Sequence, residues 1–258
     1  MTHEFDGKEY EKAATHQREW GQKLIGDLAL QGDECVLDLG CGDGGLTARI
    51  ADSLPRGKVV GIDASRGMIE AALPKRRENL TFRLMDIDDL DHLDCYDIIF
   101  SNAALHWVKD HRRLLHSVRR ALRTGGRLRL NFAGDGNCSH FFGVVREAMA
   151  SAELAASFSS YEWPFYMPAL ADYQALIRES GWCNVRVWGE NADRHFPDVK
   201  AMVRWLDQPC LVPFLPNVPA EGRAAFRSLV VRRMREETER SDGRCFETFR
   251  RINVSATK

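Results

Sequence analysis

A glycine-rich segment near the amino terminus has the residue types and spacing of a loop that holds a nucleotide-like cofactor. Gly40, Gly42 and Gly45 satisfy the pattern G-x-G-x-x-G, and the segment follows a short apolar run. Asp63 ends the next apolar run, where a carboxylate can accept hydrogen bonds from both hydroxyls of an adenosine ribose. Loop, strand and acid together predict an adenosine-binding site.

Two carboxylates beside this loop bear on which adenosine compound it binds. Asp38 precedes the first glycine by two residues, and Asp43 lies inside the loop. Both would oppose the negative charge of a pyrophosphate, which argues against an NAD-linked oxidoreductase. S-adenosylmethionine has no phosphate and carries a sulfonium and an ammonium group. The two carboxylates therefore favour S-adenosylmethionine.

Predicted strands and helices alternate around these residues. We expect strands at 35–39, 58–63, 80–84, 96–101 and 127–132, and helices at about 13–30, 46–54, 68–73 and 112–122. The glycine pair at 125–126 is expected to end the last of these helices. Such alternation predicts parallel βαβ units and a doubly wound α/β sheet.

After Phe132 the alternation ends. We expect a helix at about 140–156, an aromatic loop at 161–168, a helix at 171–179, a strand at 184–188, helices around a proline-rich turn within 197–239, and a last strand at about 245–254. No repeat or low-complexity linker is present, so we predict a single domain. Its expected parts are a helical lid at 1–32, a cofactor-binding half at 33–134, and substrate-side insertions with the final strands at 135–258.

Four motifs, in order, make the chain resemble the class I S-adenosylmethionine-dependent methyltransferases. Residues 36–44 (VLDLGCGDG) resemble the first motif of that family, and residues 61–65 (GIDAS) with Met68 resemble the second. Residues 86–87 (DI) match the pair after the third strand, and residues 101–107 (SNAALHW) resemble the loop after the fourth. The family implies a Rossmann-like, mostly parallel seven-stranded sheet with an antiparallel last strand. It also implies S-adenosyl-L-methionine as cofactor and S-adenosyl-L-homocysteine as product.

Within this class the chain is similar to the trans-aconitate methyltransferase-like group of small-molecule enzymes. The similar features are the Asn-Ala-x-Leu-x-Trp element at 102–107, the helical insertion after the fifth strand, and the terminal strand. The resemblance implies that Asp38 faces the amino group of the cofactor, Asp63 the ribose and Asp86 the adenine amine. The expected cofactor-binding residues are Gln17, Asp38, Gly40, Cys41, Gly42, Asp63, Ala64, Met68, Asp86, Ile87 and Asn102.

His106 is the expected catalytic residue, since it lies where family members present groups to the substrate. An alcohol or an acidic carbon would need a general base, and histidine is suited to that role. A carboxylate is already ionised at neutral pH, so His106 would then orient it by hydrogen bonding. A histidine that only packs against Trp107 is the third interpretation.

Aromatic residues are the expected substrate contacts. By resemblance, the amino-terminal helix closes over the cofactor with Tyr10 and Gln17, although a core-packing helix anchored by Trp20 explains the same sequence. Residues 163–166 (WPFY) either line the acceptor pocket or anchor the insertion. The predicted substrate-binding residues are Tyr10, Trp107, Trp163 and Tyr166. No metal site is expected.

Arginines are dense at 112–129 and at 232–251. Arginine binds carboxylates through two parallel hydrogen bonds, which would suit a polycarboxylate acceptor. Most of these arginines are expected on solvated helix faces. An arginine on a strand at the carboxyl end of the sheet would be more suggestive, but the sequence does not place one there.

Composition excludes several classes of protein. The chain of 258 residues has 36 Lys and Arg against 37 Asp and Glu, so it lacks the basic excess of a nucleic-acid binder. Its seven cysteines form no CxxC pair, which is typical of reduced thiols in the cytoplasm. No signal peptide or membrane-length apolar run is evident. We expect a cytoplasmic monomer or weak dimer with a small-molecule acceptor.

The acceptor itself is open at this point. We prefer O-methylation of a small carboxylate such as trans-aconitate. The alternatives are a malonyl-carrier-protein methyltransferase, which predicts a basic docking surface, and a terpenoid or polyketide methyltransferase. A non-catalytic S-adenosylmethionine sensor is an alternative of a different class, and it predicts cofactor binding without turnover.

Overall fold

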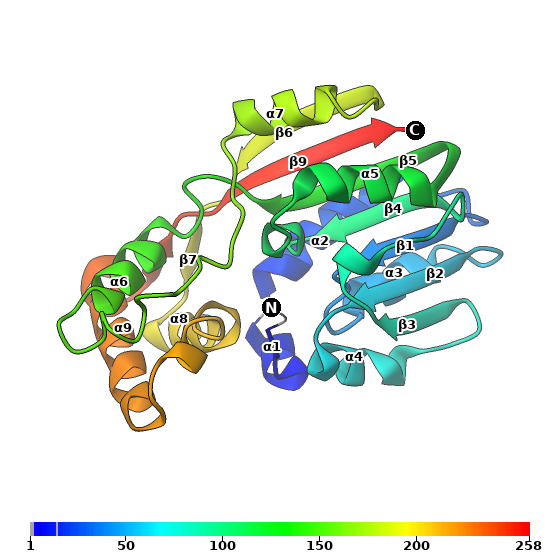
Figure 1. The fold of residues 1–258 in the computed structure, drawn as a ribbon. Coiled ribbons are helices and arrows are strands. Elements are labelled where there is room, and N and C mark those ends of the chain that lie inside the picture. Colours follow the sequence, from blue (N-terminus) through cyan, green and yellow to red (C-terminus); the bar gives the residue numbers. More distant parts are fainter. Residues whose placement is uncertain (1–2, 14) are drawn as a thin grey trace. The chain divides into compact units, whose positions relative to one another are not determined.

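The computed structural model describes residues 3–13 and 15–258 (Figure 1). Residues 1, 2 and 14 of the expected lid therefore lie outside the described residues. Contacts divide the chain into two compact units. The first holds the residues up to Asp135, Phe165–Glu190 and Arg251–Lys258, and the second holds Gly136–Pro164 and Asn191–Arg250. The single-domain description with inserted segments stays a prediction.

A seven-stranded sheet forms the first unit, in the order β3-β2-β1-β4-β5-β9-β6 (Figure 1). Its strands are β1 Cys35–Leu39, β2 Lys58–Asp63, β3 Leu80–Leu84, β4 Tyr96–Asn102, β5 Leu122–Ala133, β6 Cys183–Asn191 and β9 Arg250–Thr257. The first five strands pair in parallel, and β9 runs antiparallel to β5. The predicted doubly wound, mostly parallel sheet with an antiparallel last strand is confirmed.

Apolar side chains that alternate along the strands build a core on each face of this sheet. Leu37 and Leu39 of β1 join a cluster with α5 (His111–Ala121) and α7 (Leu170–Arg178). Val36, the residue before Leu37, points to the other face and joins the opposite cluster. The helices of that second face are α2 Thr15–Gly26, α3 Gly45–Asp52 and α4 Arg66–Ala72. A parallel sheet needs both faces covered, and these helices cover them.

The second unit is mostly helical. Its helices are α6 Ser139–Met149, α8 Val199–Trp205 and α9 Arg223–Thr238, beside a small sheet of β7 Arg194–Phe196 and β8 Cys245–Glu247. Phe141 on α6 packs against Trp205 and Phe214. The carboxylate of Glu247 is fully buried and accepts a hydrogen bond from the Phe141 amide, which anchors the start of α6 to β8.

Four sequence-based boundaries were wrong. The last strand predicted at 245–254 is two strands in different sheets, because the Phe249 amide donates to the Asp193 carboxylate instead of continuing the ladder. Gly125 and Gly126 lie inside β5, where the Gly126 carbonyl accepts from the Lys258 amide, so they do not end α5. The helix predicted at 140–156 ends at Met149. The helix predicted at 13–30 is α2, which ends at Gly26, and a separate α1 (Gly7–Ala13) precedes it.

Candidate functional site

Four polar side chains lie in a row at the carboxyl edge of the sheet. Asp86, Asp63, Asp38 and Asn102 lie at or just beyond the carboxyl-terminal ends of β3, β2, β1 and β4, which are neighbours in the sheet (Figure 1). Ligands of doubly wound folds bind outside this edge. Four of the residues predicted to bind the cofactor thus lie along this edge, and their binding roles stay predictions.

Asp63 fixes the glycine loop. One carboxylate oxygen accepts from the Gly42 amide and the other from the Ser65 amide, each at 2.9 Å. The amides of Gly40 and Cys41 both donate to the Ile62 carbonyl at 2.9 Å. Each Asp63 oxygen keeps a second lone pair, so the side chain can hold the loop and still accept a ribose hydroxyl.

The loop is open on one side. Gly42 has φ +55°, and no heavy atom lies within 4 Å of the position that a Cβ there would take. Gly40, with φ +71°, is closed in: a Cβ would lie 2.2 Å from the Cβ of Ala104. The open side at Gly42 is where a ligand can approach the backbone closely.

Asp38 is buried beneath this loop, with 2% of its surface exposed. Its Oδ2 accepts from the Thr47 hydroxyl of α3 at 2.7 Å, a partner that the sequence did not indicate. Burial, and secondarily the charge of Asp63, raises the pKa of Asp38 to about 7. Burial also raises the pKa of Asp63. A cationic ligand would stabilise the ionised form of both.

The other acidic residues of this edge have structural partners. Asp43 accepts from the Gly45 amide at 2.9 Å and pairs with Arg18 at 3.2 Å, so it closes the loop. Oδ1 of Asp86 accepts from the Asp88 amide at 3.0 Å and caps the short turn that follows β3. The Asp86 side chain thereby has a fixed orientation at the edge of the sheet.

Asn102 and Gln17 leave two buried acceptors unsatisfied. Nδ2 of Asn102 donates to the Gln17 carbonyl at 2.8 Å and ties α2 to β4. Oδ1 of Asn102 and Oε1 of Gln17 are buried with no hydrogen-bond partner in the described part of the chain. Because a buried, unsatisfied acceptor is costly, a donor such as an ammonium group is expected there. With Gly42 and the buried carboxylates, this arrangement fits S-adenosylmethionine.

His106 lies in the short turn after β4, Leu105–Trp107. Its Nδ1 is buried and has no hydrogen-bond partner among residues 3–13 and 15–258. The ring centroid lies 5.5 Å from that of Trp107 and 6.0 Å from that of Phe165. Burial, then the charges of Arg251 and His111, lowers the pKa of His106 to about 3. The imidazole is therefore neutral at physiological pH.

His111 holds this turn in place, a role that the sequence did not indicate. Its Nε2 lies 2.9 Å from the Leu105 carbonyl, and its Nδ1 lies 3.1 Å from the Tyr173 hydroxyl. The carbonyl leaves Nε2 as the donor, so Nδ1 accepts from the tyrosine. Burial lowers the pKa of His111 to about 4. A neutral, doubly bonded histidine thus fixes the turn that carries His106.

The predicted substrate-binding aromatics have different ring partners. The ring centroid of Trp107 lies 4.6 Å from that of Phe165, and the centroid of Tyr166 lies 4.6 Å from that of His111. The ring centroid of Tyr10 lies 6.1 Å from that of Phe5. Trp163 belongs to the second unit, where it packs against Phe142 and Phe214 under the guanidinium of Arg146. Their substrate roles stay predictions.

The segment before α1 lies over the second motif. The Phe5 amide donates to the Ser65 hydroxyl oxygen at 3.2 Å, and that hydroxyl donates to the Glu4 carboxylate at 3.2 Å. The Phe5 ring lies 5.8 Å from that of Trp107. The segment therefore contacts both the residue that caps the start of α4 and the turn that carries His106, as a lid over the carboxyl edge of the sheet would.

The structure places one arginine at the carboxyl edge of the sheet, where the sequence alone could not place one. Arg251 is buried at the beginning of β9, opposite Ala133 at the carboxyl end of β5. By contrast, Arg233 and Arg235 on α9 form ion pairs with neighbouring glutamates of the second unit. The strand that carries Arg251, RRINVSAT, mixes polar and apolar residues, so no local sequence signal indicated this position.

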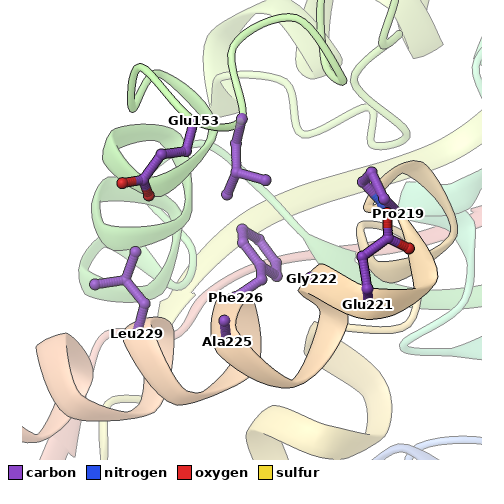
Figure 2. Close-up of a pocket in the computed structure, with 8 residues that line it drawn as sticks. Glu153, Pro219, Glu221, Gly222, Ala225, Phe226 and Leu229 are labelled. Carbon is purple, nitrogen blue, oxygen red and sulfur yellow. The ribbon is translucent and has the colours of Figure 1, made fainter.

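A pocket of about 420 Å³ lies in the second unit, between α9 and the chain after α6 (Figure 2). It is lined by Glu153, Leu154, Pro219, Glu221, Gly222, Ala225, Phe226 and Leu229. None of the predicted site residues lines it. Within the described residues, no group of His, Cys, Asp or Glu side chains is arranged to hold a metal ion, and no helix has the length and apolar character needed to cross a membrane.

Comparison with known proteins agrees with this geometry. A family model described as a methyltransferase domain matches residues 30–180. The trans-aconitate 2-methyltransferase of Acidovorax sp. (strain JS42) is 29% identical and covers 99% of both chains. That of Variovorax paradoxus is 31% identical and covers 92% of both. The solved structure of the YcgJ protein from Bacillus subtilis superposes with a TM-score of 0.65 at 17% identity, covering 93% of this chain and 98% of that one, which supports the fold.

Proposed function

The chain belongs to the methyltransferase-domain family and uses S-adenosylmethionine, and from this premise we propose that it methylates a carboxylate oxygen of a small organic acid. Relatives of almost the same length are named for trans-aconitate. An acid of that kind carries its own nucleophile at neutral pH.

The state of His106 is the observation that carries this proposal. A buried imidazole whose pKa is about 3 is a weak base, so it is poorly suited to deprotonate an alcohol or a carbon acid. A carboxylate acceptor needs no such base. The one N–H of the neutral ring can instead donate to a carboxylate oxygen and orient it, within the apolar surroundings of Trp107 and Phe165.

When bound, S-adenosylmethionine supplies a methyl group on a positively charged sulfur. The acceptor oxygen forms its bond to the methyl carbon while the carbon–sulfur bond breaks and its electrons pass to sulfur. An ester and a neutral thioether result, and no proton is released. In this scheme Asp63 binds the ribose, Asp86 the adenine amine, and Asp38 with Asn102 the ammonium end. The remaining task of the protein is alignment and exclusion of water.

Transfer of a labelled methyl group tests the proposal. Purified protein is incubated with methyl-labelled S-adenosylmethionine and a panel of small acids that includes trans-aconitate, and the products are treated with mild alkali. We expect label that is released as methanol, which marks a methyl ester. Alkali-stable label would contradict the proposal and place the acceptor at carbon, nitrogen or an ether oxygen. Cofactor binding without transfer to any acceptor, including a host metabolite extract, would support a sensor.

We also propose that the enzyme acts in the cytoplasm as a monomer or weak dimer on a free small molecule. All seven cysteines are free thiols, which is typical of a reducing compartment. Size-exclusion chromatography with light scattering measures the assembly state directly, and a stable higher oligomer would contradict this proposal.

A further inference from the structure

Thr47, in the first turn of α3, is fully buried although its side chain is polar. Its hydroxyl donates to Oδ2 of Asp38 at 2.7 Å, and Asp38 is itself buried. A hydroxyl–carboxylate bond of about 2.5–2.7 Å is typical of an ionised acceptor and is stronger than a bond between neutral groups. The contact therefore favours the charged form of Asp38 at the edge of the sheet where the cofactor is expected.

The neighbouring carboxylate, that of Asp63, is supported in a different way. It accepts from the backbone amides of Gly42 and Ser65, and no change of a side chain at those positions would remove these donors. Asp38 accepts only the Thr47 hydroxyl among the residues that the structure describes, so its Oδ1 is left for a ligand. Because an ionised carboxylate without hydrogen bonds is costly to bury, the charge of Asp38 depends on this one hydroxyl.

The groups around Asp38 otherwise oppose its ionisation. Burial raises the pKa of Asp38, the hydrogen bond from Thr47 lowers it, and the charge of Asp63 on β2 raises it further. The thiol of Cys41, in the glycine loop, stays neutral because burial raises its pKa well above the ordinary value. The Thr47 hydroxyl thus acts against both the burial of Asp38 and its repulsion by Asp63.

We propose that Thr47 is a positioning residue for the cofactor, whose hydroxyl keeps Asp38 ionised and leaves Oδ1 to accept from the ammonium group of S-adenosylmethionine. The inference rests on the proposed binding of that ammonium by Asp38, and it does not depend on the methyl acceptor. Hydroxyl and ligand use different oxygens, so both bonds exist in the bound state. When the cofactor binds a protein in which Asp38 is protonated, that proton passes to the solvent.

Calorimetric titration with S-adenosylhomocysteine, which carries the same ammonium group, tests this inference. Titration in two buffers with different heats of ionisation gives both the affinity and the number of protons released. With the pKa of Asp38 at about 7, the wild type should release about half a proton at pH 7. In Thr47→Val the release should approach one proton, and affinity at pH 7 should fall by roughly 5- to 50-fold, because the pKa of Asp38 rises by about one to two units. This difference in affinity should shrink as the pH rises to about 9.

Matched variants separate this role from packing. Thr47→Ala should reproduce the shift of Thr47→Val, whereas Thr47→Ser keeps the hydroxyl and should stay within about threefold of the wild-type affinity. Thr238→Val is the control, since it removes a fully buried hydroxyl that donates to the Met234 carbonyl of its own helix. It should lower the melting temperature and leave the affinity and the proton release unchanged.

Two results would overturn the inference. Affinity that falls equally at every pH in Thr47→Val and Thr47→Ala, with wild-type proton release, would mean that Thr47 only packs against the loop. A wild type that releases no proton on binding would refute the binding of the ammonium by Asp38 itself. No acceptor is present in these titrations, so neither result bears on the carboxylate chemistry, which the alkali treatment of the methyl product tests separately.

Discussion

The two ends of the carboxyl edge differ in charge and in how they are built. The donor side, which consists of the glycine loop with Asp38, Asp63 and Asp86, is acidic. The acceptor side, which consists of the turn 102–107 with Asn131 and Arg251, combines a neutral histidine with a buried cation. The donor carries a positive charge and a carboxylate acceptor a negative one. In the proposed reaction each side would therefore carry the charge that suits its ligand.

The contact between Gly40 and Ala104 joins the two sides, and breaking it should give the largest effect. In Gly40→Ala the new Cβ meets the Cβ of Ala104 at 2.2 Å, at a backbone φ of +71°. We expect a loss of about 2–5 kcal/mol in the free energy of unfolding, measured by urea denaturation. Gly40→Ala with Ala104→Gly should recover the steric part. A double variant no more stable than the single one would contradict this explanation.

Removing Asp63 tests the donor side alone. Asp63→Ala deletes the acceptor of the Gly42 and Ser65 amides and the expected ribose contact. We expect cofactor affinity, measured by calorimetry, to fall by about 1.5–3 kcal/mol. Gly42→Ala is a second probe of the open side of the loop: its Cβ meets no protein atom, but the φ of +55° strains the variant, so a weaker affinity must be compared with its loss of stability in thermal unfolding. Unchanged affinity in Asp63→Ala would refute the assignment of this site.

The pH dependence of cofactor binding sharpens the electrostatic contrast. The pKa of Asp38 is raised to about 7, so below that pH the free protein is protonated there and must lose a proton to bind an ammonium group. Affinity should be constant above pH 7 and fall by up to about tenfold per pH unit below it.

The stability of the cofactor-free protein changes with pH in the opposite direction to the cofactor affinity. With a folded pKa above the ordinary value of 3.8, the cofactor-free protein loses stability as the pH rises from about 4 to about 7. Asp38→Asn should remove the pH dependence that Asp38 gives to cofactor affinity and to stability. Calorimetry measures the affinity and thermal unfolding measures the stability, both between pH 5 and pH 8. Profiles that keep their wild-type slopes would assign the titration to another group, such as Asp63.

His106 should give the smallest effect if the acceptor arrives ionised. His106→Gln retains a hydrogen-bond donor, and we expect kcat to fall by less than about tenfold, with no ionisation of this residue visible in the rate above pH 5. A fall in kcat of two to four orders of magnitude, the scale typical of a general base, would mean that His106 transfers a proton. The acceptor side would then not be the neutral orienting site described above.

The same contrast explains how much the sequence could predict. The donor side is encoded locally: Asp38 and the glycines share one strand and its loop, and Asp63 ends the neighbouring strand, so spacing alone predicts their meeting. Arg251 and Asn131 are separated by 120 residues and meet through antiparallel pairing, which no local pattern encodes. The three-residue strands β7 and β8 are likewise too short to show alternation. The raised pKa of Asp38 depends on burial, which spacing does not reveal.

The position of β9 between β5 and β6 constrains the order in which this protein can be built. Because β6 precedes β9 in the chain, a ribosome delivers the outer strand before the strand that must separate it from β5 (Figure 1). Until residues 250–257 emerge, the edge of β5 has no partner on that side, and β6 has no place in the sheet. The donor side has all its strands by then. Nascent chains of this enzyme therefore acquire the strands that carry Asp38 and Asp63 before they acquire Arg251 at the other end of the same edge.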